Sequence, residues 1–596
     1  MDLATARARS ILRSAMPRPI LATVLLLAVL AILPSQRVLA QVAPRGAPIV
    51  TIDASRFVGE IAKGHVVRDA AALGVPWVFN NLALQMRTNH NYVVRAEVPA
   101  AGHYHLYART HGDSTSGFRV ALGDRVVSRK VGNAPMRFER VGEIDLPRGP
   151  VDVRLMRIEG RPVLDVLVLS TRADLREEEL VPLQLHPDVK LLREYPIPRS
   201  TMVKFGDVDG DARTDFVVFT AGYSAHAFTF DGTKRWSWEA PTEGERLRAE
   251  FEAPGAVWDL DGDGRAEVIH WREVDGREWL VAADGMTGAI KYRAPWPTRA
   301  KPHVYNNFRI AIGRLSPGAP SDVVLLSDSG DSIVVAAYDA RLQPRWSHTE
   351  LKRKDHLGHY VYPVDLDGDA IDEVVVGSLV LDAKGKERWN RFDYFFDNHD
   401  HADSYRFIDL TGDGKREIVA TESEAGVFVF DASSGRILRQ HAAEHSQQLA
   451  VGRFLTGMPA PQLAVGARTY GNAQAGEPGL SAQVWWFDPT LRLISKWPAL
   501  PLNGNPVFVQ GDWRGDGREE LFWYRFHLRG DGTGELFFPN DVFHMFDFLG
   551  DRAEEVITLA PGFMRVYGYR GARADGARVR RSADYLRDRV VNHTHY

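Results

Sequence analysis

The sequence predicts an all-β protein, with an eight-bladed β-propeller preceded by a β-sandwich of the jelly-roll kind. Three observations predict this fold class. The expected strands are short, rich in β-branched and aromatic residues, and separated by Gly, Asp and Asn turns. One turn pattern recurs from about residue 200 onwards, as in repeat architectures. No long stretch shows the period of an amphipathic helix.

The repeat begins with an apolar stretch that leads into an acidic or glycine turn, and a Val/Ile-rich strand follows the turn. One copy contains the segments 203–207, 215–219, 227–231 and 234–238. The equivalent turns lie roughly 35–60 residues apart, at Asp207, Asp259, Gly313, Asp365, Asp409, Gly452, Asp512 and Asp547. This spacing indicates eight four-stranded blades. The number would be seven if the short last unit is only a closing strand. The alternative is a stack of unrelated β-domains.

The segment 1–40 has the pattern of a signal peptide. Small residues at 38–40 suit cleavage before Gln41. A basic region precedes the apolar run 20–33, with Arg7, Arg9, Arg13 and Arg18. Because that run is short for a bilayer, we expect a secreted or periplasmic protein with no membrane span after signal removal. A retained membrane anchor is the alternative.

Three segments follow the expected signal peptide. Residues 45–175 contain several alternating, half-buried strands, which we interpret as an accessory β-sandwich of the sugar-binding kind. Residues 176–198 are charged and are expected to be a linker and lead-in to the first blade. Residues 199–596 are expected to form the propeller.

Composition excludes several classes of protein. There is no cysteine, which excludes disulfides, thiolate metal sites and a cysteine nucleophile. The formal net charge is −4, and the expected mature chain is near −8 because the signal region is basic. Such a balance argues against nucleic acid as a partner. We expect a monomer.

Several blades carry an acidic loop suited to Ca²⁺. Carboxylates at alternate positions point inward from a tight glycine-containing turn, and a later carboxylate completes the oxygen shell that calcium needs. Ordinary Asp/Gly turns without metal are the alternative. The candidate ligands are Asp207, Asp209, Asp211 and Asp215; Asp259, Asp261, Asp263 and Glu267; Asp365, Asp367, Asp369 and Glu373; Asp409, Asp413 and Glu417; and a weaker copy at Asp512, Asp516 and Glu520.

Three histidine-rich clusters precede consecutive blades. They occupy 356–360, 397–405 and 444–448. Equivalent loops of a propeller gather on one face around the channel, so these clusters are expected to converge. Histidine together with acid suits a metal, general acid/base work or the binding of an acidic sugar. Solvated polar loops are the alternative.

These features resemble two known groups of proteins. The acidic repeats resemble the FG-GAP units of integrin-type propellers. The stretch 358–454 resembles the rhamnogalacturonan lyases of polysaccharide lyase family 11, through His359, the loop 365–369, the strand 377–382, the segment 401–403, and Glu422. The segment 589–595 also resembles the closing segment of that family. The family's Gly-His-Gly-Asp motif is remodelled here to His-Asp-His-Ala-Asp at 399–403, and Val591 replaces its closing Tyr.

The resemblance implies β-elimination on an acidic polysaccharide. A lyase removes the C5 proton of a uronate and expels the C4 oxygen, after the neighbouring carboxylate has been neutralised by calcium, Arg or His. His359, His399 and His401 are the candidates for base and carboxylate binding. Tyr405 or Tyr360 is the candidate proton donor. Asp403 and Glu422 are expected to orient a histidine or hold calcium.

Two other functions remain open from the sequence. A non-catalytic propeller would bind a glycan or a surface protein through the same loops and form no product. A glycoside hydrolase would use two opposed carboxylates and form no unsaturated product. Aromatic residues of the later blades, such as Trp485, Trp486, Trp523 and Tyr524, could stack on sugars, although an aromatic residue in a blade more often belongs to the core.

Overall fold

The structure is a computed structural model, and it describes most of the chain between residues 48 and 593. Short stretches between 55 and 90 and a few runs of one to three residues elsewhere lie outside the described part. The longer undescribed segments are 1–47, 242–254, 298–308, 352–357, 392–400, 470–480, 497–507, 572–581 and 594–596. The described part is all-β apart from a few short helices, which confirms the predicted all-β class. None of its helices is long and apolar enough to cross a bilayer.

The first ten strands form two antiparallel sheets. The larger sheet contains β1 (Ile49–Asp53), β2 (His65–Arg68), β3 (Ala83–Met86), β5 (Gly102–His111), β8 (Arg137–Leu146) and β10 (Val163–Ser170). The smaller contains β4 (Asn91–Val98), β6 (Gly117–Leu122), β7 (Arg125–Val126) and β9 (Gly149–Glu159). Both contribute to one apolar core, since Leu106 and Leu167 of the larger sheet cluster with Tyr92, Phe118 and Val153 of the smaller.

The described residues also form eight four-stranded sheets, seven of which are simple meanders in strand order. The first four contain β12 (Met202–Gly206), β13 (Asp215–Phe219), β14 (Ala225–Phe228) and β15 (Lys234–Trp238); β16 (Gly255–Trp258), β17 (Glu267–Val274), β18 (Arg277–Asp284) and β19 (Ile290–Pro295); β20 (Arg309–Gly313), β21 (Asp322–Asp328), β22 (Ser332–Tyr338) and β23 (Pro344–Leu351); and β24 (Val361–Val364), β25 (Glu373–Val376), β26 (Leu379–Leu381) and β27 (Glu387–Asn390).

The next three sheets repeat this order, and the eighth takes one strand from earlier in the chain. They contain β28 (Ala402–Ile408), β29 (Glu417–Glu422), β30 (Gly426–Asp431) and β31 (Ile437–His441); β32 (Ser446–Gly452), β33 (Gln462–Thr469), β34 (Ser481–Phe487) and β35 (Leu493–Lys496); β36 (Phe508–Gly511), β37 (Glu520–Trp523), β38 (Phe526–Leu528) and β39 (Gly534–Leu536); and β40 (Val542–Phe546), β41 (Glu555–Ala560), β42 (Phe563–Tyr569) and β11 (Val189–Pro196).

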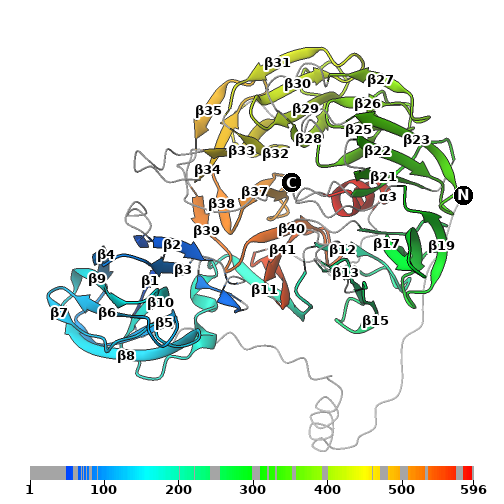
Figure 1. Ribbon diagram of the computed structural model, residues 1–596. Helices are drawn as coiled ribbons and strands as arrows, with labels where there is room; N and C mark the ends of the chain where they lie inside the picture. The colour runs from blue at the N-terminus through cyan, green and yellow to red at the C-terminus, as the bar shows by residue number, and fades with distance from the viewer. Residues whose placement is uncertain are drawn as a thin grey trace, which may run out of the picture. The chain divides into compact units, whose positions relative to one another are not determined.

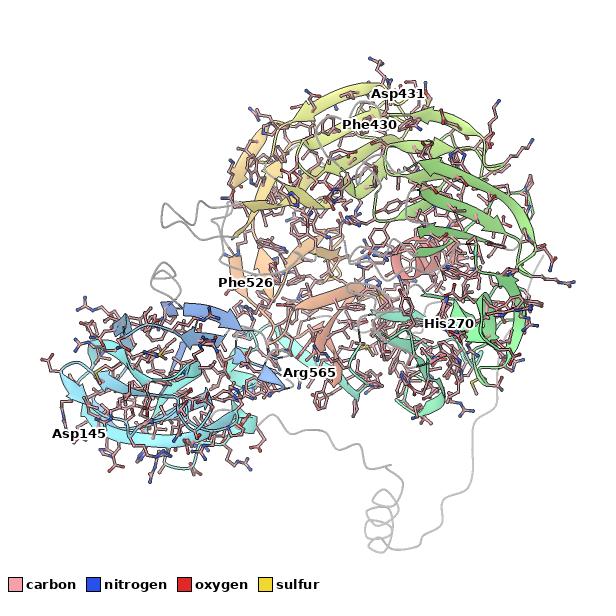
Figure 2. All side chains as sticks on the ribbon, in the orientation of Figure 1. Asp145, His270, Phe430, Asp431, Phe526 and Arg565 are labelled. Carbon is pink, nitrogen blue, oxygen red and sulfur yellow. The ribbon has the colours of Figure 1, made fainter. Side chains whose placement is uncertain are left out.

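Strand β11 differs from the expectation for its segment. Residues 176–198 were expected to be a linker and lead-in to the first blade, but Val189–Pro196 is the outer strand of the last sheet and pairs with β42. An ion pair of 2.6 Å between Arg565 of β42 and Glu194 of β11 joins the two strands. Arg565 is labelled in Figure 2. The ends of the repeat region are therefore hydrogen-bonded within one sheet. The helices η4 (Glu177–Glu179) and η5 (Pro182–Gln184) precede this strand.

The first strands of successive sheets contact one another around a circle (Figure 1). The circle closes between the last and first sheets, where the rings of Phe205 and Phe546 lie 5.0 Å apart. Tryptophans of the outer strands form hydrogen bonds to the neighbouring sheet. Trp346, for example, donates its indole N–H to Ala383 of the next sheet at 2.9 Å. Gly385 lies under that ring, and a Cβ there would come within 2.5 Å of it.

The repeat turns lie where the sequence places them. Six of the eight predicted positions directly follow the first strand of a sheet, and the other two, Gly313 and Gly452, are the last residue of such a strand. The first six sheets also share a register shift between their third and fourth strands, for example between Ala227 and Phe228 or between Val429 and Phe430. The same local irregularity at the same point indicates one repeated structural unit.

The C-terminal segment, residues 582–593, is helical rather than extended. It contains α3 (Ala583–Tyr585) and the π-helix η9 (Leu586–Val591). Arg587 pairs with Asp372 at 3.5 Å, and Arg589 pairs with Glu554 at 3.2 Å. Lys204 of β12 donates to the carbonyl of Val591 at 3.3 Å. Because it reaches the first strands of several sheets, this segment occupies the channel that those strands line.

Candidate functional site

The candidate site is a buried group of His359, His401 and Asp403, which we call the histidine–aspartate cluster. His359 lies just before β24, and the other two lie at the start of β28. The acidic loops follow these same strands. The cluster and the acidic loops therefore lie at opposite ends of the first strands. The sequence predicted this convergence from clusters 40 residues apart, and the structure brings the three residues together.

The two imidazoles share one carboxylate oxygen. Nε2 of His359 lies 3.4 Å from Oδ1 of Asp403, and Nε2 of His401 lies 3.3 Å from the same oxygen. The two rings meet edge to face with centroids 4.9 Å apart. Asp403 is fully buried, whereas the His401 side chain is 20% exposed. His401 is thus the member of the cluster that solvent reaches most easily.

A second set of polar side chains holds the other oxygen of Asp403. Nε2 of Gln447 donates to Oδ2 of Asp403 at 3.1 Å. The same amide lies 3.0 Å from Nε2 of His445. Nδ1 of His445 lies 2.5 Å from Oε1 of Glu424, which is about half exposed. This series of hydrogen-bonded side chains fixes the Asp403 carboxylate and extends from the buried cluster to the surface.

Burial and charge set the protonation of the cluster. Burial lowers the pKa of His359 to about 4, which outweighs its hydrogen bond to Asp403. Burial alone would raise the pKa of Asp403, but the charge of His401 and the hydrogen bonds from both imidazoles lower it to about 2. At neutral pH the cluster therefore contains an ionised carboxylate beside a neutral His359.

The two tyrosines that were candidate proton donors differ in position. Tyr405 is buried two residues after Asp403, and burial, followed by the charge of Glu422, raises its pKa well above the ordinary value. Its hydroxyl therefore keeps its proton. Tyr360 is also buried, and its ring lies under the guanidinium of Arg309 at 4.8 Å. Ser378 donates to Glu422 at 3.3 Å, and the charge of Glu422 acts on the Tyr405 hydroxyl.

The donor atoms of the cluster fit a metal ion. One atom each from His359, His401 and Asp403 lies within 4.8 Å of the others. Two imidazoles and a carboxylate are a donor set that suits divalent transition metals better than calcium, which prefers oxygen. His399, the third histidine predicted for this site, lies outside the described residues. Trp485, Trp486, Trp523 and Tyr524 are buried, as expected for core residues.

The acidic loops share one construction. The first carboxylate of the loop accepts backbone N–H groups further along, as when Asp207 accepts from Gly210 at 2.7 Å and from Ala212 at 2.8 Å. The closing carboxylate reaches back, as when Asp215 accepts from Val208 at 2.8 Å. The same pattern occurs in the loops that begin at Asp259, Asp365, Asp409, Asp512 and Asp547. The Asp547 loop was predicted only as a turn, and Leu549 stands at its third position.

Two loops already contain a positive side chain. Nζ of Lys291 lies 2.7 Å from Asp261, 3.2 Å from Asp263 and 2.6 Å from Glu267. Arg388 is 3.0 Å from Asp367 and 2.7 Å from Glu373 in the fourth sheet. The sequence analysis missed both residues, since each lies on a fourth strand, far along the chain from its loop.

The first and fifth sheets differ from these two. In the first sheet Arg213 pairs with Asp211 at 2.6 Å. Among the described residues, however, no lysine or arginine makes an ion pair with Asp215, Asp409 or Glu417. Burial, followed by the charge of Asp209, raises the pKa of Asp215 to about 7. A divalent cation would neutralise this concentration of carboxylates, so these two loops best fit the calcium prediction.

The chain is similar in sequence to two curated proteins. No protein-family model matches the sequence. The rhamnogalacturonan endolyase YesW of Bacillus subtilis is 24% identical over 412 residues, which are 53% of this chain and 64% of the relative. The exolyase YesX of the same organism is 24% identical over 429 residues, 53% of this chain and 68% of the relative. The chain thus spans about two thirds of the length of these curated relatives.

Solved structures of similar fold include the same class. The crystal structure of rhamnogalacturonan lyase YesW has a TM-score of 0.48 at 17% identity, covering 82% of this chain and 89% of that chain. A rhamnogalacturonan lyase of Bacillus licheniformis has a TM-score of 0.48 at 17% identity, covering 83% and 90%.

Proposed function

We propose that this protein is a polysaccharide lyase that cleaves an acidic, uronate-containing polysaccharide of the rhamnogalacturonan class by β-elimination. The observation that carries the proposal is the sequence similarity of about half the chain to two rhamnogalacturonan lyases. The histidine–aspartate cluster supplies groups of the type that such a reaction needs.

The residues of the cluster can take different roles in β-elimination. The base must be neutral before it takes the C5 proton, and His359 is neutral at pH 7 because burial lowers its pKa to about 4. His401, one fifth exposed, is placed to meet the substrate. Asp403 orients both rings. Alternatively, a divalent cation held by these three residues would neutralise the uronate carboxylate, and a residue other than His359 would then take the proton. Tyr405, which keeps its proton, is the candidate donor to the leaving C4 oxygen.

The proposal also covers the propeller architecture, the domain formed by the first ten strands, the calcium sites and export. We infer that the eight four-stranded sheets are the blades of one propeller with FG-GAP-like loops, and that β1 to β10 form an accessory sandwich. Calcium is proposed for the loops of the first and fifth sheets, where no internal cation pairs with the closing acid. The segment 1–40 is proposed to direct export. The protein would then act on polysaccharides outside the cytoplasm.

The test is absorbance near 235 nm, roughly where an unsaturated uronate absorbs, during incubation with rhamnogalacturonan and a panel of other acidic polysaccharides. Each substrate is assayed with calcium, with zinc and with a chelator. A metal-dependent rise with rhamnogalacturonan is the expected result. A flat trace on every substrate, with binding still seen by affinity electrophoresis, would replace the lyase by a glycan-binding propeller. New reducing ends without absorbance would indicate a hydrolase.

A further inference from the structure

The larger of the two sheets formed by β1 to β10 contains a second group of histidines and acids. Strand β5 contributes His103 and His105, and strand β8 contributes Glu143 and Asp145. The two strands are antiparallel, with His103 opposite Asp145 and His105 opposite Glu143. Because side chains alternate between the two faces of a sheet, all four side chains point to the same face. The sequence analysis singled out none of them.

This face of the sheet is directed away from the core. The intervening residues Tyr104, Leu106 and Ile144 are buried and belong to the core that the two sheets share. The side chains of His103 and Glu143 are, by contrast, 49% and 58% exposed. Strand β8 is the last in the order of its sheet, so the group also lies at an edge. An ion can therefore reach it from solvent without displacing core residues.

The spacing of the donor atoms suits a single metal ion. Nε2 of His103 lies 3.9 Å from Oε2 of Glu143, and Nδ1 of His105 lies 3.5 Å from the same oxygen. One atom each from these three residues lies within 4.8 Å of the others. Ligands bonded to a tetrahedral zinc ion at about 2.1 Å lie roughly 3.4 Å from one another. Small side-chain rotations would therefore bring the three atoms to bonding distance of one ion.

Asp145 holds one of the imidazoles by its other nitrogen. Oδ1 of Asp145, which is labelled in Figure 2, lies 2.9 Å from Nδ1 of His103. A carboxylate only accepts hydrogen bonds, so Nδ1 of the neutral ring has the proton, and Nε2 keeps its lone pair. Nε2 is the nitrogen close to Glu143. A carboxylate that orients a histidine through its second nitrogen is the usual partner of a metal-ligating histidine.

Arg140 is the cation that would compete with a metal ion here. Its Nη1 lies 3.4 Å from Nδ1 of His105. Because a guanidinium only donates hydrogen bonds, this contact requires a lone pair on Nδ1, the same lone pair that a metal would use. Arg140 is exposed, so water can replace its contact with His105 when an ion binds.

We propose that His103, His105 and Glu143 bind a divalent transition-metal ion of the zinc class, with Asp145 orienting His103. Two imidazoles and one carboxylate suit such an ion, whereas calcium and magnesium prefer oxygen ligands. Solvent completes the coordination shell on the open face. The ion joins β5 to the edge strand β8 and stabilises the folded state, because it binds only when the two strands are paired. The site goes beyond the lyase proposal, since it shares no residue with the histidine–aspartate cluster or the acidic loops.

The experiment is isothermal titration calorimetry of the full chain with zinc chloride, in saturating calcium so that any acidic loop that binds calcium is already filled. The variants His103→Gln, His105→Gln and Glu143→Gln each remove one ligand. The matched control is His111→Gln, on the same strand but eight residues beyond His103. His359→Ala reports separately on the histidine–aspartate cluster, whose donor atoms also suit zinc. Thermal unfolding in EDTA checks that each variant is folded.

We expect each ligand variant to bind one zinc ion fewer than the wild type, or to bind that ion at least tenfold more weakly. His111→Gln should keep the wild-type stoichiometry and affinity. Asp145→Asn should weaken binding by about 10–100-fold, the usual effect of removing the partner of a metal-ligating histidine. Arg140→Gln should tighten binding, because it removes the competing cation.

Two results would overturn the proposal. Equal stoichiometry and affinity in His103→Gln and the wild type would leave the four residues as ordinary pairs across two strands. Loss of zinc in His359→Ala alone would assign the ion to the histidine–aspartate cluster. Neither result depends on whether the protein is a lyase, since the titration measures binding of zinc and not turnover of a polysaccharide.

Discussion

Lys291 should stabilise the second sheet in place of a metal ion, and its removal should make that sheet dependent on calcium. The perturbation is Lys291→Met, which keeps the apolar stem and deletes the ammonium. Three carboxylates then lose their cation, and one of them, Glu267, is 1% exposed. Burial, the largest influence, raises the pKa of Glu267, so an uncompensated charge at this position is unfavourable.

The expected loss in the free energy of unfolding follows from the geometry of the ion pairs. Removing one partner of a buried pair costs about 3–5 kcal/mol. Because the Lys291 side chain is 24% exposed, solvent screens part of its charge. We therefore expect a loss of about 2–3 kcal/mol in the free energy of unfolding when a chelator is present. Calcium at about 100 times its Kd for the vacated loop would restore about 2.7 kcal/mol.

The assay is urea denaturation of the wild type and Lys291→Met, each with EDTA and with millimolar calcium. Lys386→Met is the control, since Lys386 is an exposed lysine on a hairpin of the fourth sheet. The variant should lose stability in EDTA and recover most of it with calcium, beyond any gain in the wild type. Equal stability of variant and wild type in EDTA would refute the stabilising role of the ammonium. A loss that calcium does not reverse would refute the idea that the loop can accept a metal in its place.

Three further predictions concern the acidic loops and the candidate site. Burial and neighbouring acids raise the folded-state pKa of Asp215 from 3.8 to about 7, so the free energy of unfolding in EDTA should fall as the pH rises from about 4 to 7 and then level off. Calcium should flatten this pH profile. A profile that is already flat in EDTA would contradict the prediction. His359→Ala and His401→Ala should each lower the rate of 235 nm absorbance increase by about 100-fold or more, while His441→Ala, whose ring packs on Trp485 away from the cluster, should not. Gln447→Leu removes a donor from the buried carboxylate of Asp403 and should cost about 1–3 kcal/mol of stability, with a lower kcat at little-changed KM; an unchanged kcat would exclude a positioning role.

Much of the fold follows from local sequence pattern, because an antiparallel meander pairs neighbouring strands through short turns. Val217 and Val218 occupy a strand that the sequence predicted, after a turn whose Asp and Gly residues favour that backbone. The three members of the histidine–aspartate cluster were also predicted to meet, because equivalent positions of a repeat fall on the same face. The pairing of Asp403 with Gln447, however, depends on a contact between neighbouring sheets that no local pattern specifies.

The sequence by itself determined the all-β class, the positions of the repeat turns and the convergence of the histidines, because each depends on a period or on contacts close along the chain. Only the tertiary structure placed β11 in the last sheet and the C-terminal segment in the channel, since closing a ring joins residues hundreds of positions apart. It also showed which acidic loops hold their own cation. The second and fourth strands of a meander begin at the end where the first strand finishes, and that geometry brings Lys291 to a loop more than twenty residues earlier.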